Sequence, residues 1–247
     1  MKKLSLLLLC ALLSCSGTPP MKIVAHRGYW KADGAVQNSI ASLKAAGEIK
    51  VYGSEFDVWL TADGRMVVNH DADYNGLEIA SSTFDALRQY PLANGEPIPS
   101  LEEYLEAAQA YPALHLVLEL KSNYQAAYDS AAVAYAWNKV SEYGLADRTT
   151  YISFSFEACR LFAKAGGDVQ YLGSDRSVDE LHAAGITGLD AHHSLYESHP
   201  ETVSQAHAAG MTVNAWTVNE KADALRLRAL GVDMLTTDEP AGMNYLR

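Results

Sequence analysis

Acidic side chains recur at two-residue spacing in two apolar segments that read as β-strands. Glu55 and Asp57 lie in the segment GSEFDVW, and Glu119 precedes Lys121 in HLVLELK. Because successive side chains of a strand point to opposite faces, the two members of each pair share a face. Three converging carboxylates would repel one another unless a cation compensates, and oxygen ligands suit Ca2+, Mg2+ or Mn2+ better than zinc. The spacing predicts one divalent cation site, with a metal-free salt-bridge cluster as the alternative.

Two histidines lie close to these carboxylates in the predicted arrangement. His26 ends the strand-like run KIVAH, and His70 follows MVVN, which reads as a short additional strand. Histidine titrates near neutral pH, so such a pair suits a reaction in which one proton is removed and another delivered. His192 and His193 follow a later strand at the same rim and are reserve candidates. Packing or solvation accounts for the other four histidines.

These carboxylates and histidines can act together only in a fold that brings the ends of their strands to one place. Eight short apolar runs alternate with helical patterns over about 230 residues, the arrangement of an α/β protein of the (β/α)8 TIM-barrel type. A doubly wound open sheet is the alternative, but the turn after the first run lacks GxGxxG. Barrel active sites lie at the carboxyl ends of the strands, where the acidic pairs fall. The predicted strands are 22–26, 53–59, 115–121, 149–154, 168–173, 186–190, 211–218 and 233–237.

Local signals mark the ends of the helices between these strands. Serines at 100 and 177, each followed three residues later by glutamate, predict capping boxes. Glycines at 47, 166, 185, 210 and 231 are predicted to follow helix ends. The stretch 71–99 has no clear strand–helix unit, and we expect an extended loop with a small helix near 84–90.

The first twenty residues have the layout of an export signal. Two lysines precede an apolar run from Leu4 to Leu13, and small residues follow. This run is shorter than the roughly 20 residues that a membrane-spanning helix needs. Leu12 to Cys15 resembles the lipobox of bacterial lipoproteins, which predicts Cys15 as the lipidated first residue of the mature chain. Cleavage near Ser14 or Ser16, which would leave a free periplasmic protein, is the alternative.

We therefore expect residues 1–20 to form a signal peptide with a short tether, and residues 21–247 to form a single barrel domain. The protein would be exported to the periplasm or cell envelope and would contact the membrane only through its lipid anchor.

The composition is that of a folded protein. Among the 247 residues, 49% are hydrophobic and 20% are charged, which excludes wholesale disorder. Lysine and arginine number 19 against 30 acidic residues, a net charge of −11 that disfavours nucleic acid as a partner. Three cysteines do not make a disulfide framework. No protein partner is indicated.

Several motifs, taken in order, resemble the glycerophosphodiester phosphodiesterases, in particular their exported bacterial forms. They are AHRG at 25–28, SEFDVWLTADGRMVVNHD at 54–71, LVLELK at 116–121, VNAWTVN at 213–219 and GVDMLTTDEP at 231–240. The ordered combination of HRG, E-x-D, T-x-D-G, HD and E-x-K is far more specific than any one motif. The resemblance implies a TIM barrel of the phospholipase-C-like phosphodiesterase type.

The resemblance also implies roles for individual residues around a phosphodiester. A divalent cation would be held by Glu55, Asp57 and Glu119. The acid–base pair would be His26 and His70, with His26 favoured as the base. Arg27 and Lys121 would bind the phosphate, and Trp216 would form part of the substrate wall unless it only fills the barrel.

One departure from the family pattern lies after the HRG motif. The family usually has Pro-Glu-Asn-Thr there, whereas this chain has Val36, Gln37, Asn38 and Ser39. The neutral Gln37 leaves the region one negative charge poorer, so metal preference or affinity is expected to differ if that glutamate contributes charge around the metal.

The implied activity is hydrolysis of small-molecule glycerophosphodiesters to glycerol 3-phosphate and an alcohol such as choline or ethanolamine. Attack by the neighbouring glycerol hydroxyl would give a cyclic phosphate that water then opens, and direct attack by water is the alternative. Two other functions stay open. One is a phospholipase-like phosphodiesterase that acts on intact lipid head groups, and the other is a non-catalytic binding barrel.

Overall fold

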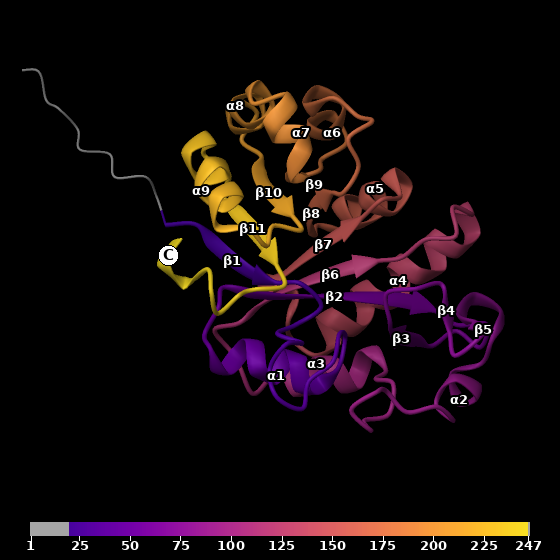
Figure 1. Cartoon of the computed structure of the whole chain (residues 1–247). Coiled ribbons are helices and arrows are strands. Elements are labelled where there is room, and N and C mark those ends of the chain that lie inside the picture. The colour runs from indigo at the N-terminus through magenta and orange to yellow at the C-terminus, as the bar shows by residue number, and fades with distance from the viewer. Residues whose placement is uncertain (1–19, 247) are drawn as a thin grey trace, which may run out of the picture.

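Eight parallel strands close into a barrel in the computed structural model, which describes residues 20–246 (Figure 1). The order around the barrel is β1, β11, β10, β9, β8, β7, β6 and β2, and pairing of β2 with β1 closes it. The prediction of a TIM barrel is confirmed, and all eight predicted runs form strands. The barrel strands are β1 Lys22–Ala25, β2 Gly53–Leu60, β6 His115–Leu120, β7 Thr149–Ser153, β8 Asp168–Tyr171, β9 Gly188–His192, β10 Thr212–Trp216 and β11 Met234–Thr237.

Helices connect the strands and cover the outside of the barrel (Figure 1). Two short helices lie between β9 and β10, and within the described residues a single 3-10 turn, Asn244–Leu246, follows β11. The helices are α1 Ile40–Glu48, α2 Phe84–Leu87, α3 Leu101–Ala108, α4 Ala126–Glu142, α5 Phe156–Ala165, α6 Val178–Ala183, α7 His193–Ser198, α8 Glu201–Ala208 and α9 Lys221–Leu230, with 3-10 turns at Ile79–Ser81 and Ala146–Arg148.

The barrel strands are buried on both faces, because one face meets the helices and the other fills the barrel. All eight residues of β2 are buried, including its two acidic residues. A separate apolar cluster inside the barrel contains Val24, Val117, Ile152 and Leu172. Val117 lies two residues before Glu119 and therefore shares its face. The carboxylates thus lie above an apolar floor, towards the carboxyl ends of the strands.

The predicted capping boxes are both present, at Ser100 with Glu103 and at Ser177 with Glu180. Gly47 does not end a helix as predicted, since α1 continues to Glu48. A Cβ atom at Gly47 would lie 2.3 Å from the ring of Tyr111, so glycine is needed here for close packing.

The segment that joins β2 to α3 has more structure than the predicted loop. Strand β3, Met66–Val68, pairs antiparallel with β2, and β4 Asp73–Tyr74 pairs with β5 Leu77–Glu78 around an Asn-Gly turn. The small helix α2 ends at Leu87, earlier than predicted. A satellite core holds the segment against the barrel through Trp59, Val67, Ile79, Phe84, Leu87 and Ile98.

The two ends of the described chain lie side by side at the base of β1. The backbone N–H of Met21 donates to the carbonyl of Leu246 at 3.0 Å. The predicted export signal and Cys15 lie outside the described residues. Among residues 20–246, none of the helices is both long and apolar enough to cross a membrane.

Candidate active site

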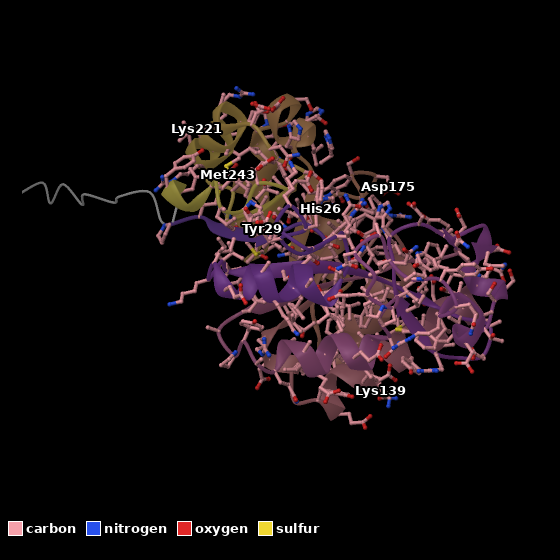
Figure 2. The ribbon with its side chains drawn as sticks, turned by 60° about the horizontal axis from the view of Figure 1, so that its bottom comes forward. His26, Tyr29, Lys139, Asp175, Lys221 and Met243 are labelled. Atoms are coloured by element: carbon pink, nitrogen blue, oxygen red, sulfur yellow. The ribbon has the colours of Figure 1, made fainter. Side chains whose placement is uncertain are left out.

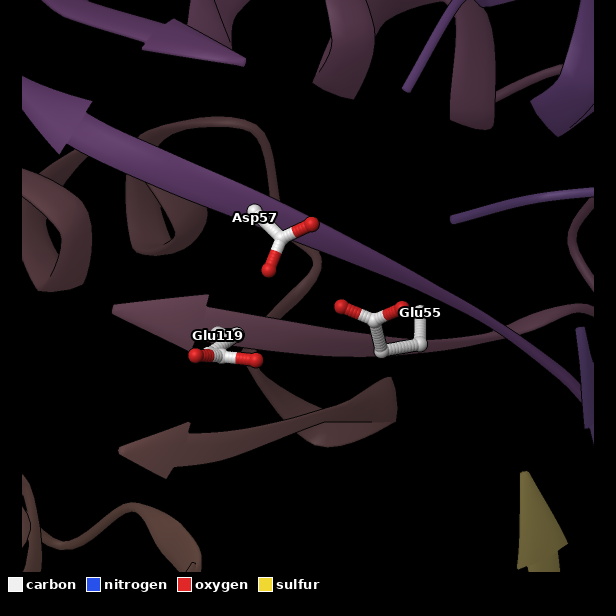
Figure 3. Close-up of side chains that lie close together, drawn as sticks. All are labelled: Glu55, Asp57 and Glu119. Atoms are coloured by element: carbon white, nitrogen blue, oxygen red, sulfur yellow. The ribbon is translucent and has the colours of Figure 1, made fainter. Parts of the chain in front are cut away.

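Three carboxylates converge in the mouth of the barrel, where β2 and β6 lie side by side. Glu55 and Asp57 project from β2, and Glu119 projects from the adjacent β6, where it is in register with Asp57. One oxygen from each carboxylate lies within 4.8 Å of the others. Figure 3 shows the three groups facing a common space from two neighbouring strands. The pairing of β2 with β6 therefore brings these side chains together.

Burial makes this concentration of negative charge costly. Burial, and then repulsion by Asp57 and Glu119, raises the pKa of Glu55 well above its usual value. Burial, and then repulsion by Asp57, raises the pKa of Glu119 to about 8. Burial acts in the same direction on Asp57, but Lys121, His70 and Asn38 outweigh it and lower the pKa of Asp57. Without a bound cation, burial and mutual repulsion therefore oppose the ionisation of Glu55 and Glu119.

Two cations lie beside the carboxylates. Lys121 Nζ is 2.6 Å from Glu119 Oε1 and 3.0 Å from Asp57 Oδ1. Arg27 Nε is 3.8 Å from Asp57 Oδ2. Burial opposes the charge on Lys121, but Asp57 and Glu119 raise its pKa above the usual value. Both cations line the same cavity as Glu55 and Glu119, where they can meet an anionic substrate.

The turn after β1 is built around Glu55. The backbone N–H of Arg27 donates to Glu55 Oε2 at 2.7 Å, and that of Gly28 donates to the Glu55 carbonyl at 3.0 Å. Arg27 adopts a φ of 54° and Gly28 a φ of 76°. A left-handed conformation is unfavourable for arginine, so the surrounding contacts hold it there. At Gly28 a Cβ atom would also lie 2.3 Å from Ser42 Oγ, which explains the glycine.

Asn38 holds Asp57 in place. Its Nδ2 donates to Asp57 Oδ2 at 2.8 Å, and its Oδ1 accepts from the Asp57 backbone N–H at 3.1 Å. Asn38 has a φ of 60°, a conformation that asparagine tolerates better than most residues. Gln37, the departure from the family pattern, accepts a hydrogen bond from Arg27 Nη1 at 2.7 Å. The side chain of Gln37 therefore contacts Arg27, and position 37 does not belong to the group of residues that could hold a metal ion.

His26 follows β1 and pairs with a residue that the sequence analysis missed. Its Nδ1 lies 2.8 Å from Oδ1 of Asp238, just beyond β11. Figure 2 labels His26 where the N-terminal and C-terminal parts of the ribbon meet. Asp238 also accepts from Trp30 Nε1 at 3.0 Å and from Asn219 Nδ2 at 2.9 Å. Burial opposes its ionisation, but the hydrogen bonds from these three side chains hold the pKa of Asp238 well below its usual range.

Because an ionised Asp238 can only accept a hydrogen bond, a neutral His26 would carry its proton on Nδ1 and keep the lone pair on Nε2. Asp238 directly follows β11, and Asn219 lies in the turn that follows β10, both at the rim of the barrel that carries the active site. This position after a barrel strand is the sequence feature from which their role could have been predicted. Nothing local to Trp30 indicated its role.

His70 follows β3 and lines the same cavity. Its Nδ1 lies 2.7 Å from Oδ1 of Asp71, so this histidine also has a carboxylate partner. Burial lowers the pKa of His70, and Asp57 opposes this shift. Both predicted acid–base histidines thus reach one cavity with an aspartate at Nδ1.

The cavity has a volume of about 190 Å3 and spans the barrel mouth. Glu55, Glu119 and Lys121 lie on the β2 and β6 side, while Ile152, Phe154, Leu172 and Trp216 supply apolar lining. Trp216 Nε1 donates to the Asp190 carbonyl at 3.2 Å, and its ring meets that of Phe154 edge to face. Trp216 is therefore a wall of the cavity. The reserve histidines His192 and His193 are not among its lining residues.

The residues present fit a divalent cation. All three grouped side chains supply oxygen, the ligand that hard cations prefer. Oε1 of Glu55 is buried without a hydrogen-bond partner among the described residues, and such atoms are uncommon in folded proteins. A cation would satisfy that oxygen and offset the repulsion among the three carboxylates.

Comparison with known proteins gives a consistent picture. The model of the glycerophosphoryl diester phosphodiesterase family matches residues 26–242. The structure is similar to that of a glycerophosphodiester phosphodiesterase from Parabacteroides distasonis, with a TM-score of 0.91 and 43% identity over 93% of this chain and 98% of that chain.

Two further relatives cover nearly the same region. A phosphodiesterase from Oleispira antarctica, solved in complex with the product sn-glycerol-3-phosphate, has a TM-score of 0.80 and 26% identity over 92% of this chain and 96% of that chain. A glycerophosphodiester phosphodiesterase from Caldanaerobacter subterraneus subsp. tengcongensis is 26% identical over 243 residues, or 88% of this chain and 94% of the relative.

Proposed function

The chain belongs to the glycerophosphoryl diester phosphodiesterase family, and from this we propose that it hydrolyses glycerophosphodiesters to glycerol 3-phosphate and an alcohol. One observation carries the proposal. A single cavity is lined by two of the three grouped carboxylates, by two histidines with aspartate partners, and by two cations suited to a phosphate. Each group has a separate task in opening a phosphodiester.

In this proposal Glu55, Asp57 and Glu119 hold one divalent cation, Ca2+, Mg2+ or Mn2+. When bound, the cation would polarise substrate oxygens and offset negative charge that develops at phosphorus. Lys121 and Arg27 would bind phosphate oxygens, which matters because the chain carries a net charge of −11 and does not attract anions as a whole. Local positive charge at the cavity must therefore attract the anionic substrate.

His26 would act as the base and His70 as the acid. Asp238 orients His26 so that Nε2 is free to accept the proton of the attacking hydroxyl. His70 would deliver a proton to the oxygen of the departing alcohol. Burial lowers the pKa of His70 in the substrate-free protein, and the negative charge of a bound phosphodiester favours its protonated form.

The attacking group would be the glycerol hydroxyl next to the phosphate ester. Its oxygen bonds to phosphorus, the ester bond to the alcohol breaks, and a cyclic phosphate forms. Water then adds to phosphorus and opens the ring to glycerol 3-phosphate, with the histidine roles exchanged. Direct attack by water is distinguished by detection of the cyclic ester by phosphorus NMR during turnover.

The test begins with purified protein treated with a chelator. Release of glycerol 3-phosphate is measured with glycerophosphocholine and glycerophosphoethanolamine as Ca2+, Mg2+ or Mn2+ is restored. His26→Ala and His70→Ala should each lower kcat by about 10²- to 10⁴-fold, the scale of acid–base catalysis. His182→Ala, in the exposed part of α6, is the matched control and should retain activity. Absence of release with every combination of metal and substrate rejects the proposal.

Intact phospholipids are a second candidate substrate class. A hollow beside His70 is lined by Tyr124 and Phe154, whose exposed fractions are 74% and 41%. Exposed aromatic side chains at the mouth suit contact with an apolar substrate. Comparison of phospholipid vesicles with the deacylated diesters separates the two, and preference for vesicles would favour the phospholipase-like activity.

Residues 1–20 would export the protein and anchor it through Cys15, as their pattern predicts. The support is the lysine-containing start, the apolar run and the lipobox-like end. Fractionation of cells that express the native chain or Cys15→Ser provides the test. Native protein in the membrane fraction and variant protein outside it support the anchor, whereas the same distribution for both contradicts it.

A further inference from the structure

Asp190 is a buried acid that the proposed reaction does not use. It lies on β9, is 1% exposed and lines the same cavity as Glu55 and Glu119. Its Oδ1 atom has no hydrogen-bond partner among the described residues. Folded proteins rarely leave a buried carboxyl oxygen unpaired, so this atom is available to a molecule bound in the cavity.

The position of Asp190 relative to the metal-ligand group follows from the strand order. In the closed barrel β9 lies four strands away from β2 in either direction, directly across the barrel from Glu55 and Asp57. The cavity reaches both sides, since Glu55 and Asp190 both line it. A substrate whose phosphate lies among the cations of the β2 and β6 side would extend its remaining atoms towards Asp190.

The surroundings of Asp190 suit a neutral ligand group better than a phosphate. Ile152 and Leu172 line the cavity with it and belong to the apolar cluster inside the barrel. Asn214 is in register with Asp190 on β10, and its side chain forms a hydrogen bond with the Asp190 carboxyl while its Nδ2 also donates to Thr236 Oγ1 at 3.0 Å. Burial raises the pKa of Asp190 to about 8, and the Asn214 side chain opposes this shift. A protonated carboxyl donates one hydrogen bond and accepts others, as a hydroxyl ligand requires.

We propose that Asp190 binds the terminal hydroxyl of the glycerol unit, the hydroxyl farthest from the phosphate. The proposal rests on the proposed function and names the residue by which the cavity would select glycerol esters. The hydroxyl next to the phosphate ester stays with the reacting group, and only the terminal one reaches across the barrel. Asp190 would thereby determine specificity without taking part in proton transfer at phosphorus.

The test uses two product-like inhibitors that differ at one hydroxyl. Glycerol 3-phosphate has the terminal hydroxyl, whereas 2-hydroxypropyl phosphate keeps the neighbouring hydroxyl and lacks the terminal one. The native protein should bind glycerol 3-phosphate more tightly by about tenfold, the scale of one hydrogen bond to a buried group. Equal inhibition constants for the two compounds in the native protein overturn the proposal without any variant.

Variants then assign the selectivity to Asp190. Asp190→Leu has no hydrogen-bonding group and should reduce the ratio of inhibition constants to near one, while Asp190→Asn, which both donates and accepts, should keep most of it. Gln170→Leu is the matched control, because Gln170 is a buried polar residue of the barrel interior that does not line the cavity. Retention of the native ratio in Asp190→Leu, or loss of it in Gln170→Leu as well, overturns the assignment.

The native protein's turnover of glycerophosphocholine is measured in the same preparations. If turnover is absent, the proposed function fails. If turnover is present and the inhibitor ratio does not depend on Asp190, only the present inference fails.

Discussion

Nδ1 of His26 lies 2.8 Å from Oδ1 of Asp238, although 212 positions separate the two residues in the chain. Closure of the barrel creates this pair. Strand β1 is parallel to β11, with Ala25 in register with Thr237, so the residues that follow each strand are neighbours. The first and last strands of the barrel therefore build one functional unit.

Replacement of Asp238 by alanine is expected to lower kcat more than it changes KM. Without the carboxylate, His26 loses the partner that fixes its orientation and places the proton on Nδ1. We expect a fall in kcat of about 10- to 100-fold, part of the usual scale of acid–base catalysis. Steady-state kinetics on glycerophosphocholine provide the measurement. A native kcat in a folded Asp238→Ala protein would contradict the role of this pair.

Removal of one carboxylate should abolish stabilisation by a divalent cation. A ligand at one hundred times its Kd stabilises a folded protein by about 2.7 kcal/mol. We therefore expect Ca2+, Mg2+ or Mn2+ to raise the Tm of the native protein after chelator treatment. The same addition should leave Glu119→Gln unchanged. Glu142→Gln, an exposed acid at the end of α4, serves as the control and should respond like the native protein. An undiminished response in Glu119→Gln would show that the ion binds elsewhere.

A glutamate at position 37 should weaken substrate binding. Gln37 Oε1 accepts from Arg27 Nη1 at 2.7 Å without a negative charge of its own. In Gln37→Glu the new carboxylate would form an ion pair with Arg27 and compete with the phosphate for it. We expect KM to rise about threefold to tenfold, the effect of a charge-assisted hydrogen bond at an exposed site. Gln37→Met, of similar length and uncharged, should change KM less. A KM that falls in Gln37→Glu would instead point to a contribution of that charge to metal binding.

His115 should make the unfolding free energy depend on pH at acidic values. The residue begins β6, stacks on Tyr52 and lies 2.8 Å from Thr150 Oγ1 through its Nε2. Burial lowers its pKa to about 4, compared with 6.5 in an unfolded chain. Between these two values the unfolded chain binds a proton that the folded protein does not, so stability is lost as the pH falls from 6.5 towards 4.

The contribution of a single histidine to this slope is at most about 1.4 kcal/mol per pH unit. Urea unfolding at several pH values between 4 and 7 measures it. His115→Phe keeps an aromatic ring beside Tyr52 and removes the titrating group, and its unfolding free energy should vary less over this range. An equal slope in both proteins would contradict the assignment to His115.

The sequence by itself determined the local features of this protein. Alternation of apolar runs with helical patterns predicted the eight barrel strands, and two-residue spacing predicted that Glu55 and Asp57 share a face. Both are properties of residues a few positions apart, and strand geometry converts them directly into direction. Motif order also identified His26 and His70 as residues near the carboxylates.

Only the tertiary structure decided which distant residues complete the site. Closure of the barrel brings Asp238 into contact with His26 and puts Asp190 on the opposite side from Glu55. No repeating pattern in the sequence indicates either relationship. Whether an acid is buried, paired or left with an unsatisfied oxygen depends on the neighbours that other strands supply. The physical reason is that spacing along a strand sets the direction of a side chain, whereas strand order and burial set what that side chain meets.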